Sequence, residues 1–184
     1  SPAIAVYNPD GSFAGPSLSD DFRTANPIAQ ALSLKNNLKR NRILGNIFAE
    51  FQIANHLTYR TEFGGDFGTS INNRFQPRYQ YGEIEVESNT LSIANNYNDF
   101  WVVKNFLTYN NRFDDKHDVT VLLGAESQES SYGGVTSTDG DFVGNDFPIL
   151  GTGDADDNSQ QFKASQSLES YFGRVIYSFD NKYS

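Results

Sequence analysis

One acidic stretch of the sequence, TSTDGDFVGNDFPILGTGDADDNSQ, contains residue types that bind calcium. Asp154, Asp156 and Asn158 alternate as the first ligands of a calcium-binding loop do, and Ca²⁺ prefers carboxylate and amide oxygens. However, the sixth position of such a loop would be Ser159 instead of glycine, and the twelfth would be Ser165 instead of glutamate. We therefore interpret the stretch as a solvated acidic loop, whose three alternating residues are the only metal candidates.

Closely spaced carboxylates can also hydrolyse glycosidic bonds as an acid–base pair. Acidic residues alternate in two places: Glu83, Glu85 and Glu87, and Asp139 with Asp141. Nothing in the flanking sequence marks one of them as buried. His56 and His117 lie in turn-like sequence without a second ligand at metal-binding spacing. Because the GxSxG, HExxH and P-loop patterns are also absent, we expect no enzyme and no cofactor.

Aromatic and arginine side chains in two long polar stretches are candidates for contacting a ligand. They are Arg74, Phe75, Arg78, Tyr79, Tyr81, Tyr132, Phe142 and Phe147. Aromatic faces offer a large contact area at a small cost in side-chain entropy, and they stack on sugar rings or pack against peptides. The alternative is that these rings pack within their own loops and that the arginines balance acidic neighbours.

Composition excludes several classes of protein. The 184 residues carry a net charge of -9, which disfavours nucleic acid as a partner. Aromatic residues make up 14% of the chain, which argues against disorder. Without cysteine, neither disulfides nor thiol chemistry can occur. Methionine is absent as well, so we expect a chain that is processed, excised or taken from an internal position of a longer protein.

Five segments alternate between apolar and polar residues with a period of two, which predicts β-strands. Their expected bounds are residues 42–54, 57–67, 98–113, 118–131 and 167–179. In the first, Ile43, Ile47 and Phe51 share one face, whereas Glu50 lies on the other. The sequence therefore predicts an all-β fold of long, antiparallel, amphipathic strands.

The connections between these segments alternate in length. Short turns join the first segment to the second and the third to the fourth, whereas residues 1–27, 68–96 and 133–165 are predicted to be long loops. Short turns at one end and long loops at the other are typical of outer-membrane barrels. The apolar face would then contact lipid and the polar face would line the lumen. The candidates for the lumen face are Glu50, Arg60, Glu62, Arg112, Glu126 and Arg174.

Four stretches of the chain, NPIAQAL, NFLTYNNRF, HDVTVLLGAESQESSYGG and SYFGRVIYSFDNKYS, resemble the SusC/RagA family of TonB-dependent outer-membrane transporters. The resemblance covers nearly the whole chain and is strongest over residues 98–134 and 168–184. It implies that the chain is a partial slice of a transmembrane barrel of about 22 strands, with short periplasmic turns and long extracellular loops.

The resemblance also implies partners and a location. Members of this family import glycans or peptides across the cell outer membrane, with a SusD-like surface lipoprotein as a lid. The chain departs from the family pattern because it has no plug, no TonB box and no terminal strand that ends in an aromatic residue. Coupling to TonB is therefore expected through the plug of a parent chain. The alternative that we keep is a soluble β-sandwich or carbohydrate-binding module, in which the apolar faces would pair into one dry core.

Overall fold

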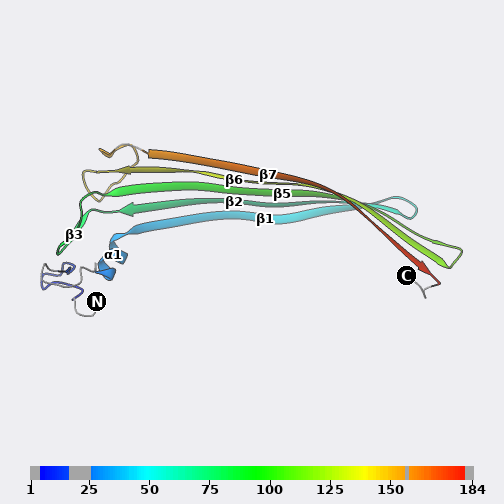
Figure 1. Ribbon diagram of the computed structural model, residues 1–184, viewed down its shortest axis with the longest axis horizontal. Coiled ribbons are helices and arrows are strands. Elements are labelled where there is room, and N and C mark those ends of the chain that lie inside the picture. The colour runs from blue at the N-terminus through cyan, green and yellow to red at the C-terminus, as the bar shows by residue number, and fades with distance from the viewer. Residues whose placement is uncertain (1–4, 17–25, 156–157, 181–184) are drawn as a thin grey trace. The chain divides into compact units, whose positions relative to one another are not determined.

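The computed structural model describes residues 5–16, 26–155 and 158–180, and its regular structure is almost entirely strand (Figure 1). The elements are α1 (Pro27–Ser33), β1 (Lys35–Ala54), β2 (Leu57–Gln76), β3 (Tyr79–Tyr81), β4 (Ile84–Val86), β5 (Thr90–Phe113), β6 (His117–Gly140) and β7 (Asn158–Phe179). The five long strands form one antiparallel sheet in the order β1-β2-β5-β6-β7, and β3 pairs with β4 in a separate hairpin. The sheet is not closed within this chain.

The long strands extend beyond their predicted bounds at the end that carries the longer connections. β2 continues to Gln76 instead of residue 67, and β6 continues to Gly140 instead of residue 131. β1, β5 and β7 begin about seven to nine residues earlier than predicted, because backbone pairing with a neighbouring strand does not require apolar side chains. The expected loops 68–96 and 133–165 consequently shorten to residues 77–89, which include the β3–β4 hairpin, and residues 141–157.

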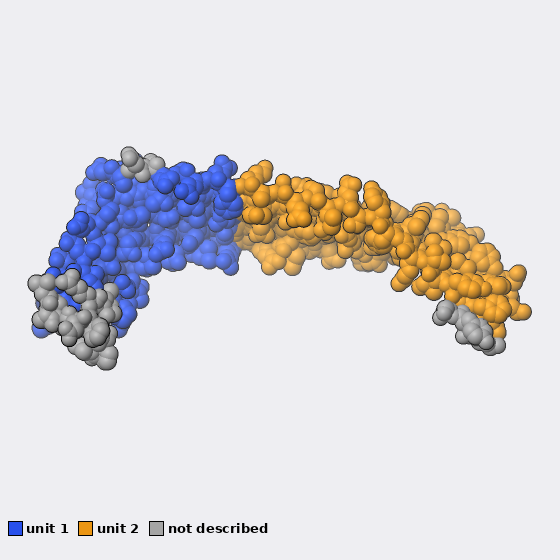
Figure 2. All heavy atoms as spheres, in the orientation of Figure 1, with its two compact units in different colours: residues 1–40, 70–96, 134–162 blue, residues 41–69, 97–133, 163–184 orange. Residues whose placement is uncertain are grey.

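The chain divides into two compact units, which we describe separately (Figure 2). Unit 1 comprises residues 1–40, 70–96 and 134–162 and carries the longer connections. Unit 2 comprises residues 41–69, 97–133 and 163–184 and carries the tight turns. In the part of the chain that the structure describes, no helix has the length and apolar character needed to span a membrane.

Unit 1 has a small hydrophobic core of its own. Phe75 from β2, Leu91 from β5 and Phe142 from the loop after β6 are each at most 6% exposed. Ile93 and Leu150 pack against this cluster. The rings of Phe75 and Phe142 lie 6.4 Å apart, a spacing at which aromatic pairs attract each other. This core attaches the loop after β6 to the ends of two other strands.

The helix α1 begins at a well-formed N-cap. The Asn26 side chain accepts hydrogen bonds from the backbone amides of Ile28 and Ala29, at 3.1 and 3.3 Å, and Pro27 occupies the first helical turn. The Asn26 amide group also donates to the carbonyls of Val6 and Ala14, both at 2.9 Å. One asparagine thus joins the helix to the preceding segment.

Unit 2 is a sheet with tight turns and no comparable core. The turn residues His56, Asp114 and Asp115 have positive φ angles of 64°, 50° and 53°, a conformation that aspartate and histidine adopt more readily than most residues. Gly124 of β6 leaves space for the Phe172 ring, since a Cβ at this position would lie 2.3 Å from that ring. Among the described residues of unit 2, no hydrophobic side chain is fully buried.

Candidate functional site

The loop after β6, residues 141–155, is held in place by a buried asparagine at the start of β5. Asn89 is fully buried. Its carbonyl oxygen accepts a hydrogen bond of 2.7 Å from the amide of Phe142. Its amide group donates to the carbonyls of Phe142 and Gly144 at 3.2 and 3.0 Å, and to the Asn145 side chain at 3.2 Å. Asn89 therefore fixes the first turn of the loop by four side-chain hydrogen bonds, of which the two to Phe142 are buried.

A buried carboxylate fixes the second half of the same loop. Asp139 is 2% exposed and accepts hydrogen bonds from the backbone amides of Gly140, Gly151 and Gly153 at 2.7, 2.8 and 3.1 Å. Burial by itself raises the pKa of this carboxyl, but the amide hydrogen bonds outweigh it and hold the pKa below its usual range. Asp139 is thus ionised, and its charge is stabilised by backbone dipoles.

The connection between β2 and β3 is fastened to this loop as well. The backbone amide of Arg78 donates to the Asn145 side chain at 3.0 Å, and the Asn145 amide group returns a 2.9 Å bond to the Arg78 carbonyl. The Arg78 guanidinium also donates to the carbonyl of Phe142. Ser88 donates to the Asp141 carboxylate at 2.5 Å. Two loops that are distant in sequence therefore form one rigid surface.

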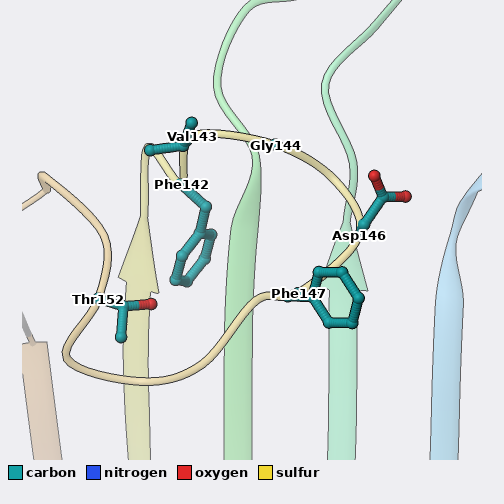
Figure 3. Close-up of a pocket in the computed structure, with 6 residues that line it drawn as sticks. All are labelled: Phe142, Val143, Gly144, Asp146, Phe147 and Thr152. Carbon is teal, nitrogen blue, oxygen red and sulfur yellow. The ribbon is translucent and has the colours of Figure 1, made fainter.

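This surface contains a pocket of about 360 Å³, formed by the loop after β6 (Figure 3). Its lining is Phe142, Val143, Gly144, Asp146, Phe147 and Thr152. Phe142 forms the buried wall, whereas Val143 and Phe147 are 96% and 86% exposed. Within the described chain, no hydrogen bond or ion pair engages the Asp146 carboxylate. The Thr152 hydroxyl donates to the carbonyl of Ile149 at 2.7 Å.

The structure gives several of the predicted ligand-contact residues a role in packing. Phe75 and Phe142 belong to the core of unit 1, and Arg78 fastens the two loops together. The rings of Tyr79 and Tyr81 stack on each other at 4.5 Å, and the Tyr81 hydroxyl lies 2.6 Å from that of Ser33. For these residues the geometry supports the alternative that the rings pack within their own loops.

Three of the predicted ligand-contact residues present their side chains to solvent. Phe147 lies at the pocket, Arg74 is exposed on β2, and Tyr132 is 52% exposed on β6. Only Phe142 and Phe147 of the eight predicted residues line the pocket. Contact of any of them with a ligand stays a prediction.

The metal site suggested by Asp154, Asp156 and Asn158 stays a prediction. Asp156 lies outside the described residues. Asp154 and Asn158 are described, but no group of three acidic, histidine or cysteine side chains in the described chain is placed to hold a metal ion. Sequence reasoning missed Asn89 altogether, and it considered Asp139 only as one half of a carboxylate pair. The Asp-Gly step at the end of β6 was the only available signal, because aspartate followed by glycine often ends a strand.

In unit 2, charged residues at even-numbered positions form pairs on one face of the sheet, both between strands and along one strand. Arg42 of β1 binds Asp66 of β2 with two hydrogen bonds, of 2.7 and 2.6 Å. Arg60 lies 2.6 Å from Glu62 and 3.6 Å from Glu50. Because these contacts join predicted lumen-facing residues, the structure brings Glu50, Arg60 and Glu62 together.

The same pattern continues across β5 and β6. Lys104 lies 3.2 Å from Glu126, and Arg112 lies 3.7 Å from Asp118. Arg174 is exposed on the edge strand β7. The paired charges balance one another, so this face is polar but carries little net charge. Whether the face lines a lumen stays a prediction at this point.

The opposite face of unit 2 is apolar and accessible. Odd-numbered side chains on β1 and β7 are exposed, among them Ile43, Ile47, Tyr171 and Val175 at 75%, 72%, 81% and 69%. On the central strand β5, Trp101 and Val103 are half-buried by their neighbours and are not enclosed. A sandwich would bury such residues in one dry core, and no such core forms among the described residues of this unit.

No protein-family model matches the chain, but curated relatives do. It is 28% identical over 192 residues to TonB-dependent receptor P26 of Formosa agariphila. The alignment covers 99% of this chain and 19% of that protein. It is also 28% identical over 194 residues to TonB-dependent receptor P3 of the same organism, with 99% and 18% coverage. The chain thus spans about a fifth of the length of the relatives it matches.

Solved structures agree with this likeness. The RagAB peptide transporter has a TM-score of 0.81 and 18% identity, and the match covers 95% of this chain and 20% of that one. The RagAB peptide importer in its closed-closed state gives a TM-score of 0.82 with the same identity and coverage. At this identity the likeness concerns the fold. Together, the comparisons confirm three predictions: the resemblance to SusC/RagA-like TonB-dependent receptors, the partial-barrel fold and the outer-membrane location.

Proposed function

We propose that this outer-membrane segment forms part of the wall and part of the outer loops of a TonB-dependent transporter. In this proposal the parent protein imports oligosaccharides or oligopeptides, and it works with a SusD-like surface lipoprotein. TonB acts through a plug supplied by the rest of the parent chain. The relatives named as TonB-dependent receptors support this assignment, and none of them is named as an enzyme.

The observation that carries the proposal is the contrast between the two faces of unit 2. One face exposes large apolar side chains such as Ile47 and Val175. The other carries paired charges such as Lys104 with Glu126, among apolar residues such as Phe48. A protein in water avoids an apolar surface of this extent unless a partner covers it, and a bilayer core requires such a surface on the lipid side of a barrel. The apolar face therefore contacts lipid, and Glu50, Arg60, Glu62, Arg112, Glu126 and Arg174 line the lumen.

The rigid surface of unit 1 then lies on the solute side of the membrane. Its loops are held by Asn89 and Asp139, so the exposed Phe147 is presented to solvent at a fixed position. Fixed, exposed aromatic residues suit the capture of a solute, because little entropy is lost when they bind. In this proposal Phe147, Arg74 and Tyr132 are the solute contacts or lid contacts of the segment.

Deletion of the parent gene in its own host tests the proposal. Uptake of labelled oligosaccharides and oligopeptides is measured in the deletion strain and in the same strain with the gene restored. The proposal predicts that uptake of one of the two classes is lost and then regained, and that the restored protein copurifies with a surface lipoprotein. Unchanged uptake of both classes would contradict it.

A further inference from the structure

The pocket in the loop after β6 is lined by apolar side chains and by polar side chains that accept hydrogen bonds. Its apolar lining residues are Phe142, which is buried, and Val143 and Phe147, which are exposed. Its polar side chains are Asp146 and Thr152. Asp146 is an acceptor when ionised, and the Thr152 hydroxyl has its proton engaged by the Ile149 carbonyl. The side chains of the pocket therefore offer hydrogen-bond acceptors and an apolar surface, but no free donor.

The sequence around the pocket strengthens this bias toward acceptors. Residues 134–162 contain no lysine, arginine or glutamate. Their charged residues are Asp139, Asp141, Asp146, Asp154, Asp156 and Asp157. The cation attached to the loop, Arg78, does not line the pocket, and its guanidinium donates to the carbonyl of Phe142. The local potential is consequently negative, which repels anionic groups and attracts cationic ones.

These properties select among the solute groups that the proposed transporter could capture. A sugar is neutral, so the negative potential of the loop does not favour its binding as it favours that of a cation. A lysine or arginine side chain combines an apolar stem with a head that only donates. Phe147 and Val143 expose apolar surface for such a stem, and the exposed Asp146 carboxylate is an acceptor for such a head.

Resting on the proposed transport function, we infer that this pocket binds a lysine or arginine side chain of an imported peptide. A volume of about 360 Å³ lies near the lower end of the range of ligand pockets and accommodates one or two residues of a longer solute. Asn89 and Asp139 preorganise the pocket because they hold the loop before the peptide arrives. The solute class is therefore basic peptides, in preference to acidic peptides and glycans.

The test uses the full-length parent protein with its partner, purified in detergent. The probes are three fluorescent octapeptides of glycine and serine that carry a central leucine followed by lysine, norleucine or glutamate. The inference predicts the tightest binding for the lysine peptide, with an affinity about tenfold above that of the glutamate peptide. Equal affinities for the lysine and glutamate peptides would overturn the inference.

Variants then localise the effect to the pocket. Asp146→Asn should weaken binding of the lysine peptide about two- to fivefold, as expected for an exposed ion pair, and leave the norleucine peptide unchanged. Phe147→Ala should weaken both. Glu85→Gln removes an exposed charge from β4 outside this pocket and is the matched control. If Glu85→Gln and Asp146→Asn act alike, the inference is wrong.

The design separates this inference from the proposed function. A parent protein that imports oligosaccharides and binds none of the octapeptides would overturn the basic-peptide assignment and leave solute import intact. Unchanged uptake in the deletion strain would instead contradict solute import itself.

Discussion

The two units of this chain are stabilised in opposite ways. Unit 1 encloses its own core of Phe75, Leu91 and Phe142. It also buries three polar side chains, Asn26, Asn89 and Asp139, which bind backbone groups. Unit 2 encloses no comparable core among its described residues and exposes its large apolar side chains. In the proposed arrangement, unit 1 is stabilised by its own core, whereas the apolar face of unit 2 contacts lipid.

The largest effect is expected from a charge on the apolar face of unit 2. Ile47→Arg places arginine on β1 where the present side chain is 72% exposed. In the full-length protein it should cost about 2–4 kcal/mol if the position lies near the bilayer centre. The measurement is the fraction of folded protein in the outer membrane, judged by heat-modifiable migration.

The matched control is Gln52→Arg, which places the same residue on the polar face of the same strand. We expect near-normal assembly of this variant. If both variants assembled normally, the apolar face would not contact lipid, and the contrast between the units would need another explanation.

The second effect concerns the buried amide of unit 1. Asn89→Ala removes the side-chain hydrogen bonds to Phe142, Gly144 and Asn145. The free energy of opening of the loop should fall by about 2–3 kcal/mol, because buried backbone groups lose their partners. Hydrogen–deuterium exchange of residues 141–150 measures this change. Asn73→Ala, at an exposed asparagine of β2, should leave the exchange unaltered.

The third prediction is a pH dependence of the loop after β6 in unit 1. The pKa of Asp139 is lower in the folded loop than its ordinary value. Its contribution to stability is therefore complete above about pH 4, the unperturbed pKa range of aspartate, and is lost as the pH falls through the folded pKa. Exchange of Gly151 and Gly153, corrected for intrinsic rates, should accelerate below pH 4. In Asp139→Asn this acid-induced step should be absent.

The smallest effect belongs to the charge pairs of unit 2. Lys104 and Glu126 are 38% and 23% exposed, and exposed pairs contribute little. A double-mutant cycle with Lys104→Gln and Glu126→Gln should give a coupling of about 0.5 kcal/mol in denaturant unfolding of the full-length protein. A coupling of several kcal/mol would mean that this face is dry and tightly packed, and would contradict a water-filled lumen.

The fold could be predicted where side-chain alternation is strong. Ile43, Ile47 and Phe51 against Glu50 already indicate a two-faced strand, and the comparisons confirm the all-β class that follows from it. The strand ends could not be predicted, because residues such as Asn72 and Ser92 are polar and do not continue the alternation of apolar side chains.

The candidate site was less predictable than the fold. Phe142 and Phe147 were both identified as loop aromatics, but only Phe142 is buried. Its burial depends on Phe75 of β2 and Leu91 of β5, which pack against it. Asn89 is isolated in the sequence from the loop that it holds, 53 residues away. No local pattern predicts such a contact, since it exists only when both strands have reached their full length.

Reagent accessibility along β1 tests the central claim most directly, which is that unit 2 has one lipid face and one lumen face. The chain has no cysteine, so single cysteine substitutions can be made at each position from 43 to 53 in a cysteine-free parent protein. A membrane-impermeant maleimide is applied to the protein assembled in outer membranes. We predict reaction at even-numbered positions and protection at odd-numbered ones. Uniform reactivity along the strand, or protection on both faces, would contradict the account.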